Sequence, residues 1–84
     1  MKFKDTEYGD LSGQDVTTRI VLVYEKLNSL EGSPDILRGI FDISDNKLVN
    51  LKYSPREIYG ATWFDNNLLE NLEGDLVSFK LSRN

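Results

Sequence analysis

One unit recurs along the chain at a spacing of 21 residues, and a repeat of this kind restricts the fold more than any other feature of the sequence. When the segment 30–50 is aligned with 51–71, seven of the 21 positions are identical. The identical pairs are Leu30/Leu51, Ser33/Ser54, Pro34/Pro55, Gly39/Gly60, Asn46/Asn67, Leu48/Leu69 and Asn50/Asn71. The chain of 84 residues is therefore expected to form one domain of stacked units, each burying its apolar face against its neighbours.

The apolar residues of one unit surround an asparagine. The stretch Phe41-x-Ile43-x-x-Asn46-x-Leu48 follows the L-x-L-x-x-N-x-L core of a leucine-rich repeat. Alternate residues of a strand point to the same face, so Phe41 and Ile43 are expected to point inward together. The asparagine then turns the chain, because its amide can bond both a backbone N–H and a backbone carbonyl that the turn would leave unpaired. In the first unit Glu25 stands at this position and lacks the donor half of the interaction.

These features predict a mostly β fold, a short leucine-rich-repeat solenoid. Its parallel strands are expected at about 19–24, 40–45, 61–66 and 78–82. Ser33-Pro34 and Ser54-Pro55 predict single 3₁₀ turns on the convex side rather than long helices, and Gly39 and Gly60 allow a tight bend into the next strand. The single domain 1–84 divides into an N-terminal cap at 1–15, repeats at about 16–36, 37–57 and 58–74, and a C-terminal capping strand at 75–84. In the cap, Phe3, Tyr8 and Leu11 are expected to cover the open end.

A second signature lies between the strands. Its residues are Leu27-Asn28-Ser29-Leu30-Glu31-Gly32-Ser33-Pro34, Leu48-Val49-Asn50-Leu51-Lys52-Tyr53-Ser54-Pro55, and the lead-in Tyr8-Gly9-Asp10-Leu11-Ser12-Gly13-Gln14. The repeated block resembles the short leucine-rich-repeat proteins encoded by large tailed bacteriophages and some bacteria, over about residues 8–84. The resemblance implies a protein-binding module whose target is a host or phage protein. It brings no catalytic or cofactor residues.

The residue types that are absent limit the chemistry. The chain has no cysteine and no histidine, which removes the usual zinc ligands and the commonest general base. We therefore expect no enzyme activity, no cofactor and no metal. The formal net charge of −4 argues against binding nucleic acid through a basic surface. The longest apolar run, 20–24, is too short to span a bilayer, and the stretch 2–5 does not begin a signal peptide, so the expected location is cytoplasmic, in the bacterial host if the protein is phage-encoded.

The repeat alignment also predicts which side chains are exposed on the strand face. The central column is Val21, Asp42, Trp63 and Lys80, and its neighbour is Val23, Ser44, Asp65 and Ser82. The flanking columns are Arg19, Ile40, Ala61 and Ser78, and then Tyr24, Asp45, Asn66 and Arg83. The predicted partner-binding residues are Trp63, Asp42, Asp65, Val21, Tyr24, Asp45 and Lys80. Trp63 is the predicted anchor, because Trp and Tyr dominate protein interfaces.

Each of these residues also has a structural interpretation. Trp63 could fold over the edge of the thin core, or a register shift could turn it inward. Val21, Val23 and Tyr24 could be covered by the N-terminal segment, since a fully apolar strand is usually buried on both faces. Asp42, Asp45 and Asp65 could form a Ca²⁺ site or a catalytic carboxylate pair. The stretch 42–46 lacks the glycine of a calcium-binding loop, which argues against the metal site. A flat sheet face offers no shielded pocket, which argues against acid–base catalysis. A solvated acidic face that steers a basic partner is the simplest interpretation.

The function that these observations favour is a non-enzymatic protein-binding module, a phage-encoded modulator or inhibitor of a host protein. Two alternatives remain open at this level. The first is self-assembly into a homodimer through the exposed edge of the last strand, 78–82. The second, ranked low because a net charge of −4 is ordinary for this length, is an acidic mimic of nucleic acid.

Overall fold

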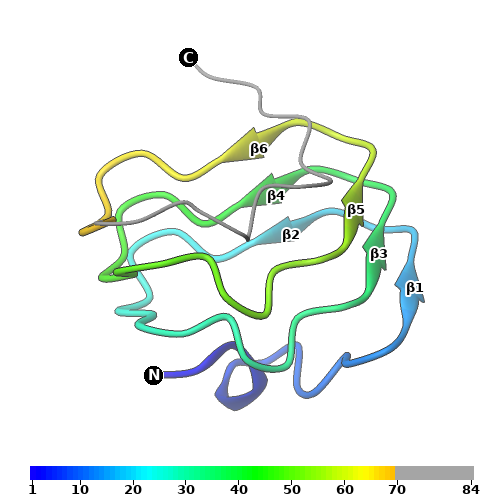
Figure 1. Ribbon diagram of the computed structural model, residues 1–84, viewed down its shortest axis with the longest axis horizontal. Coiled ribbons are helices and arrows are strands. Elements are labelled where there is room, and N and C mark those ends of the chain that lie inside the picture. The colour runs from blue at the N-terminus through cyan, green and yellow to red at the C-terminus, as the bar shows by residue number, and fades with distance from the viewer. Residues whose placement is uncertain (70–84) are drawn as a thin grey trace.

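The computed structural model describes residues 1–69, which fold into short strands arranged in two sheets. One 3₁₀ helix, η1 (Phe3–Asp5), comes first. The strands are β1 (Asp15–Val16), β2 (Ile20–Val21), β3 (Ile36–Leu37), β4 (Phe41–Asp42), β5 (Glu57–Ile58) and β6 (Thr62–Trp63). The sheets have the orders β1-β3-β5 and β2-β4-β6, and every strand pair is parallel. Figure 1 shows the two sheets meeting at an angle, with η1 below them. The mostly β prediction is confirmed.

The spacing of the sequence repeat equals the register of both sheets. In the first sheet Asp15 pairs with Ile36, and Ile36 pairs with Glu57. In the second sheet Ile20 pairs with Phe41, which pairs with Thr62. Each step is 21 residues, so residues that align in the sequence are neighbours in space. Parallel pairing needs a connection of about a dozen residues or more between paired strands, and the 21-residue spacing provides it.

The strands of the second sheet lie within three of the predicted ranges but are shorter. Cross-strand bonding continues past them, because the Leu22 and Ile43 amides donate to the Asp42 and Trp63 carbonyls at 2.8 Å each. Three residues after each of these strands the backbone is left-handed, at Tyr24 (φ 59°), Asp45 (φ 58°) and Asn66 (φ 58°). The predicted strand 78–82 and the C-terminal cap 75–84 lie outside the described residues.

The prediction of 3₁₀ turns after Ser33-Pro34 and Ser54-Pro55 is wrong. These segments lead into β3 and β5 instead. The amides of Asp35 and Arg56 donate to carbonyls of the preceding unit, at 3.0 and 2.7 Å, rather than to a carbonyl three residues back. The Ser33 hydroxyl likewise donates to the Tyr53 carbonyl of the next unit instead of capping a helix. Bonding between units therefore replaces the local bonding that defines a 3₁₀ turn.

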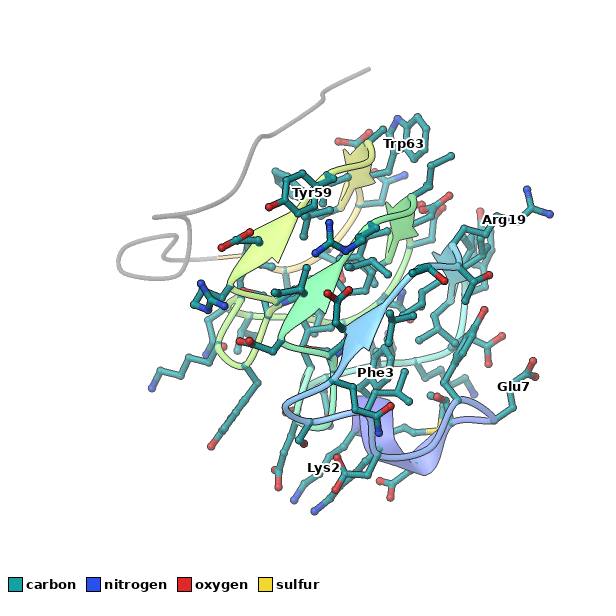
Figure 2. All side chains as sticks on the ribbon, turned by 90° about the vertical axis from the view of Figure 1, so that its right-hand side faces the viewer. Lys2, Phe3, Glu7, Arg19, Tyr59 and Trp63 are labelled. Carbon is teal, nitrogen blue, oxygen red and sulfur yellow. The ribbon has the colours of Figure 1, made fainter. Side chains whose placement is uncertain are left out.

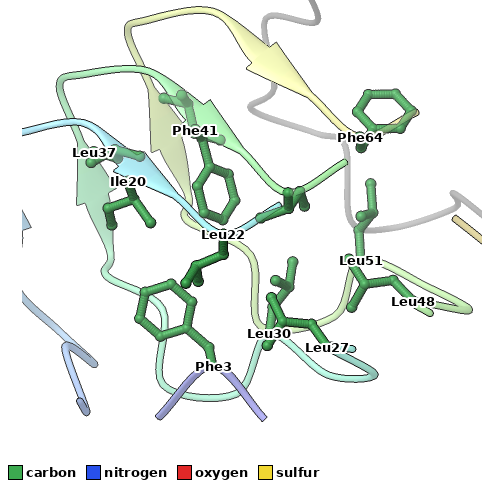
Figure 3. Close-up of a cluster of buried hydrophobic side chains, with 12 residues drawn as sticks. Phe3, Ile20, Leu22, Leu27, Leu30, Leu37, Phe41, Leu48, Leu51 and Phe64 are labelled. Atoms are coloured by element: carbon green, nitrogen blue, oxygen red, sulfur yellow. The ribbon is translucent and has the colours of Figure 1, made fainter. Parts of the chain in front are cut away.

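The core runs along the stack between the two sheets and the turns that face them (Figure 3). Its buried members are Phe3, Ile20, Leu22, Leu27, Leu30, Leu37, Phe41, Ile43, Leu48, Leu51, Ile58 and Phe64. In the second sheet Ile20 and Leu22 are buried while Val21 between them is exposed, which is the alternation of a strand with one solvent face. Each fully buried side chain of this size stabilises the fold by about 1.5–3 kcal/mol.

The N-terminal segment packs against the first unit. Phe3 is fully buried and stacks with Tyr8, with 6.0 Å between ring centroids, and Leu11 also packs on the core. The Phe3 amide donates to the Ser29 carbonyl at 3.0 Å, and Lys2 and Ser29 form an isolated parallel bridge outside the two sheets. The packing predicted for the three cap residues is therefore observed, and the apolar end of the first unit is covered.

Gly39 and Gly60 are required by close packing between units rather than by an unusual bend. A Cβ atom on Gly39 would lie 2.8 Å from the Arg19 amide nitrogen. A Cβ atom on Gly60 would overlap the Gly39 carbonyl oxygen. The backbones of successive units approach each other most closely at this corner, where only glycine fits.

Candidate protein-binding face

The outward side chains of the sheet β2-β4-β6, together with the residues that flank them, form what we call the strand face. Val21 pairs with Asp42 and Asp42 pairs with Trp63, so the predicted central column is a real row across three units. Val21 is 44% exposed, and Asp42 and Trp63 are half-buried. The strand face is therefore open to solvent along the row. Lys80, predicted to continue it, lies outside the described residues.

Trp63 points away from the core. Its neighbours Thr62 and Phe64 are both buried, at 0% and 8% exposure, so no register shift turns the indole inward. Figure 2 shows Trp63 at the outer surface, far from Phe3 in the interior. The interpretation in which Trp63 points inward is wrong, and the half-buried indole keeps part of its surface for contact.

The N-terminal segment does not cover the apolar residues of the first strand. Val21 stays exposed, Val23 is half-buried and Tyr24 is 77% exposed. The segment reaches this strand through the Tyr8 hydroxyl, which accepts a hydrogen bond from the Val21 amide at 3.2 Å. That bond satisfies one donor at the sheet edge without hiding the side chains. The interpretation that this strand is buried on both faces is therefore wrong.

An asparagine ladder holds the turns at the end of the strand face. The Asn46 Oδ1 atom accepts from the amides of Glu25 and Leu27, both at 3.0 Å. Its Nδ2 atom donates to the carbonyls of Leu22 at 2.7 Å, Ile43 at 2.9 Å and Ser44 at 3.0 Å. Each bond joins one unit to the next or closes the turn of its own unit. The predicted role of this asparagine is confirmed.

Asn67 continues the ladder one unit later. Its Oδ1 atom accepts from the Leu48 amide at 3.0 Å, and its Nδ2 atom donates to the carbonyls of Ile43 and Phe64 at 3.0 Å each. The rigid turns fix the spacing of the side chains beside them.

Asp42 has a local partner that the sequence interpretation missed. One of its carboxylate oxygens, Oδ1, accepts from the Ser44 amide at 3.2 Å and the Ser44 hydroxyl at 2.7 Å. The same geometry joins Asp10 to Ser12 near the N-terminus, where these hydrogen bonds lower the pKa of Asp10. Asp-x-Ser is a known turn signal, so the spacing could have revealed both pairs.

The second flanking column contains the left-handed residues Tyr24, Asp45 and Asn66. Asn66 donates to the Asp45 carboxylate at 2.9 Å, so two units are joined here as well. Asp45 and Asp65 are both half-buried. Asp and Asn tolerate left-handed backbone, whereas a tyrosine there is strained. Tyr24 is thus an exposed aromatic side chain in an unfavourable backbone conformation.

The other sheet carries the charges that form ion pairs. Arg38 bonds Asp15 through two nitrogens at 2.9 Å each and lies 5.1 Å from the centre of the Tyr59 ring. The hydrogen bond from Arg38 lowers the pKa of Asp15, and the hydrogen bond to Glu57 raises the pKa of Tyr59. Arg56 bridges Asp35 and Glu57 at 3.1 and 2.8 Å. The two arginines on this surface therefore already pair with carboxylates of the same chain.

Two further properties concern metals and membranes. Within residues 1–69, no three Asp, Glu, His or Cys side chains gather closely enough to hold a metal ion. The same residues contain no helix with the length and apolar character needed to cross a membrane.

Comparisons with known protein families, curated proteins and solved structures found no match to this chain. Interpretation of the site therefore rests on its own geometry.

Proposed function

We propose that this protein is a leucine-rich-repeat solenoid that binds another protein through the strand face and has no catalytic activity. The observation that carries this proposal is the row Val21–Asp42–Trp63, in which an exposed apolar residue, a carboxylate and a half-buried indole lie side by side on an open sheet. Interfaces are enriched in Trp and depend on a few such anchors. The phage-like repeat motifs favour a host protein as the target and modulation or inhibition as the outcome.

The solenoid part of the proposal is supported by features that repeat at the same spacing. Both sheets have a register of 21 residues. The asparagine ladder and the glycine corner join successive units at the same positions each time. In a leucine-rich repeat the strand carrying the L-x-L pattern precedes the asparagine, and β2, β4 and β6 lie at that position.

Tyr24 supports the binding role independently. A non-glycine residue in left-handed conformation costs roughly 1–2 kcal/mol. Tyr24 accepts this strain while remaining 77% exposed, so its ring gains little from packing within the protein. Residues in strained backbone conformations cluster at functional sites, which favours a role for Tyr24 in binding. Because Tyr24 borders the strand face, its ring is placed to extend the contact made by Val21 and Trp63.

Site-specific crosslinking tests the proposal. A photoreactive phenylalanine derivative replaces Val21 on the strand face, and in a control protein it replaces Thr17, which is exposed beside the other sheet. After irradiation in bacterial lysate, we expect one partner to crosslink from position 21 and not from position 17. A partner that crosslinks equally from both positions, or only from position 17, contradicts the proposed face. A crosslinked pair of copies of this chain points to self-assembly instead.

A second variant separates binding from folding. Tyr24→Asn places a residue that tolerates left-handed backbone at the strained position, as in the two following units. We expect the free energy of unfolding to rise by about 1 kcal/mol while partner capture weakens. Opposite changes in stability and binding cannot arise from misfolding. Undiminished capture by Tyr24→Asn removes this residue from the interface.

A further inference from the structure

We propose that the strand face recognises an arginine side chain of its protein partner, held between the Asp42 carboxylate and the Trp63 indole. This inference rests on the proposed function, because it specifies the chemistry of the partner that the same face binds. Its basis is the position, bonding and charge of these two residues, together with a matching arrangement elsewhere in the chain.

Asp42 and Trp63 are adjacent in space. They are direct partners in the parallel pairing of β4 and β6, so their side chains leave neighbouring strands on the same side of the sheet. Neighbouring strands lie about 4.8 Å apart. A planar cation that lies against the indole is therefore also within hydrogen-bonding reach of the carboxylate. Both side chains are half-buried, which limits their motion while leaving one side open.

The Asp42 carboxylate is oriented but only partly used. Ser44 occupies Oδ1 through its amide and its hydroxyl. Oδ2 has no hydrogen-bond partner among residues 1–69, and no cation of that part of the chain pairs with Asp42. A carboxylate fixed by one oxygen presents the other to a donor without losing further conformational freedom on binding.

The distribution of ion pairs makes the charge on this face distinctive. Away from the strand face, Glu31 pairs with two lysines, and Asp15 and Asp35 each pair with an arginine. On the strand face, Asp42 and Asp45 bond only to neutral groups. Arg19 flanks the face, but it forms no ion pair within residues 1–69, and Figure 2 shows its side chain extending into solvent. Within residues 1–69, Asp42 and Asp45 therefore carry charges that no cation pairs, which makes this part of the face complementary to a cation of a partner.

The other sheet contains an arginine that contacts both a carboxylate and an aromatic ring. There a carboxylate on one unit, Asp15, and an aromatic ring on another, Tyr59, enclose the Arg38 guanidinium on the unit between them. On the strand face the carboxylate and the aromatic residue are direct neighbours on adjacent strands, and within residues 1–69 no arginine pairs with this carboxylate. The spacing of the groups differs between the two sheets, but the chemistry is the same, a guanidinium bound by a carboxylate and an aromatic ring.

Arginine fits this place better than lysine. Its planar guanidinium stacks on an aromatic face while its N–H groups donate in the plane to a carboxylate. A lysine ammonium cannot do both with the same geometry. Val21, on the other side of Asp42 in the row, provides apolar contact for a residue next to the arginine. The expected recognition element is an exposed arginine beside an apolar side chain.

Selection from a library of random peptides displayed on phage, with the intact protein as bait, tests this inference. Recovered peptides are tested against Asp42→Asn, which retains an oxygen for Ser44 and removes only the charge. The matched control is Asp10→Asn, which has the same local bonds to a serine and loses the same charge away from the strand face. We expect peptides that share an arginine, that bind Asp42→Asn at least tenfold more weakly, and that bind Asp10→Asn unchanged.

A synthetic form of one selected peptide completes the test. Replacing its arginine by citrulline keeps the shape and removes the charge, and we expect this change to weaken binding at least tenfold. Quenching of the single tryptophan reports binding directly. The arginine inference is overturned if peptides that depend on Val21, as shown by lost binding to Val21→Ser, need no arginine or bind Asp42→Asn as well as wild type. This outcome leaves the proposed binding face intact. If no selected peptide depends on Val21 or Asp42, the inference and the proposed face both fail.

Discussion

Removal of the Asn46 side chain provides the most direct test of what holds the units together. Asn46→Ala deletes hydrogen bonds to five backbone groups, distributed over two units. Among residues 1–69, the amides of Glu25 and Leu27 and the carbonyl of Leu22 form no other hydrogen bond. The Ile43 carbonyl is less affected, because it also accepts from Asn67 at 3.0 Å.

The size of the effect follows from burial. The bonds to Leu27 and Leu22 are buried, so water cannot readily replace them, whereas the bond to Glu25 is only partly buried. A buried backbone group left unpaired costs about 1–3 kcal/mol, so two such groups and the lost bonds sum to about 4 kcal/mol. A chain of 84 residues has a total stability of about 4–13 kcal/mol. Asn46→Ala is therefore expected to remove a large part of the stability.

Urea unfolding followed by the fluorescence of Trp63 and by circular dichroism measures this loss. The control is Asn50→Ala, where the side chain accepts one local bond from the Lys52 amide at 3.1 Å, and we expect a loss of less than about 1 kcal/mol. A loss below about 1 kcal/mol for Asn46→Ala would show that water or rearranged backbone replaces the amide, and would refute the reasoning that the ladder joins the units.

The remaining predictions concern the core, the corner and the ion pairs. The Thr62 hydroxyl is fully buried and has no hydrogen-bond partner among residues 1–69, so Thr62→Val, which keeps the shape, is expected to raise the free energy of unfolding by about 1 kcal/mol. An unchanged urea midpoint would indicate that the hydroxyl has a partner. Gly60→Ala places a Cβ atom against a carbonyl of the neighbouring unit and is expected to lower the thermal midpoint through a loss of about 1–3 kcal/mol, so an unaltered melting curve would show that the units can separate at this corner. The pKa values of Asp15 and Glu31 are lowered by hydrogen bonds from Arg38 and from the two N-terminal lysines, respectively. The stabilising contribution of these two carboxylates is therefore complete above their ordinary pKa values of 3.8 and 4.5, and it is lost as the pH falls through the lower pKa values of the folded state. The urea concentration at the unfolding midpoint is expected to decrease as the pH is lowered beyond about 4.5, and to decrease less steeply in Asp15→Asn.

Several parts of the candidate site could be predicted because they depend on a local pattern. The row Val21–Asp42–Trp63 follows from the repeat spacing, since aligned positions become strand partners. The role of Asn46 follows from the chemistry of an amide at a turn. The hydrogen bond from Ser44 to the Asp42 carboxylate was not predicted, although the Asp-x-Ser spacing is visible in the sequence.

Other parts could not be predicted from the residues nearby. Ser33-Pro34 and Ser54-Pro55 favour a helical start locally, but the amides that follow find carbonyls of the preceding unit, and β3 and β5 form instead. The exposure of Val21 depends on where the N-terminal segment packs, which the apolar run 20–24 does not specify. Each of these outcomes depends on which distant group occupies the adjacent space.

The sequence by itself determined the spacing of the units, the parallel register and the division of strand residues into inward and outward sets, because a repeat of constant length imposes the same geometry on every unit. The tertiary structure alone decided that a second sheet replaces the 3₁₀ turns, that the N-terminal segment leaves Val21 exposed, and that Asp42 keeps one oxygen unpaired among the described residues. The physical reason is that backbone groups and charges take the best partner within reach. In this fold that partner often belongs to the neighbouring unit, 21 residues away along the chain.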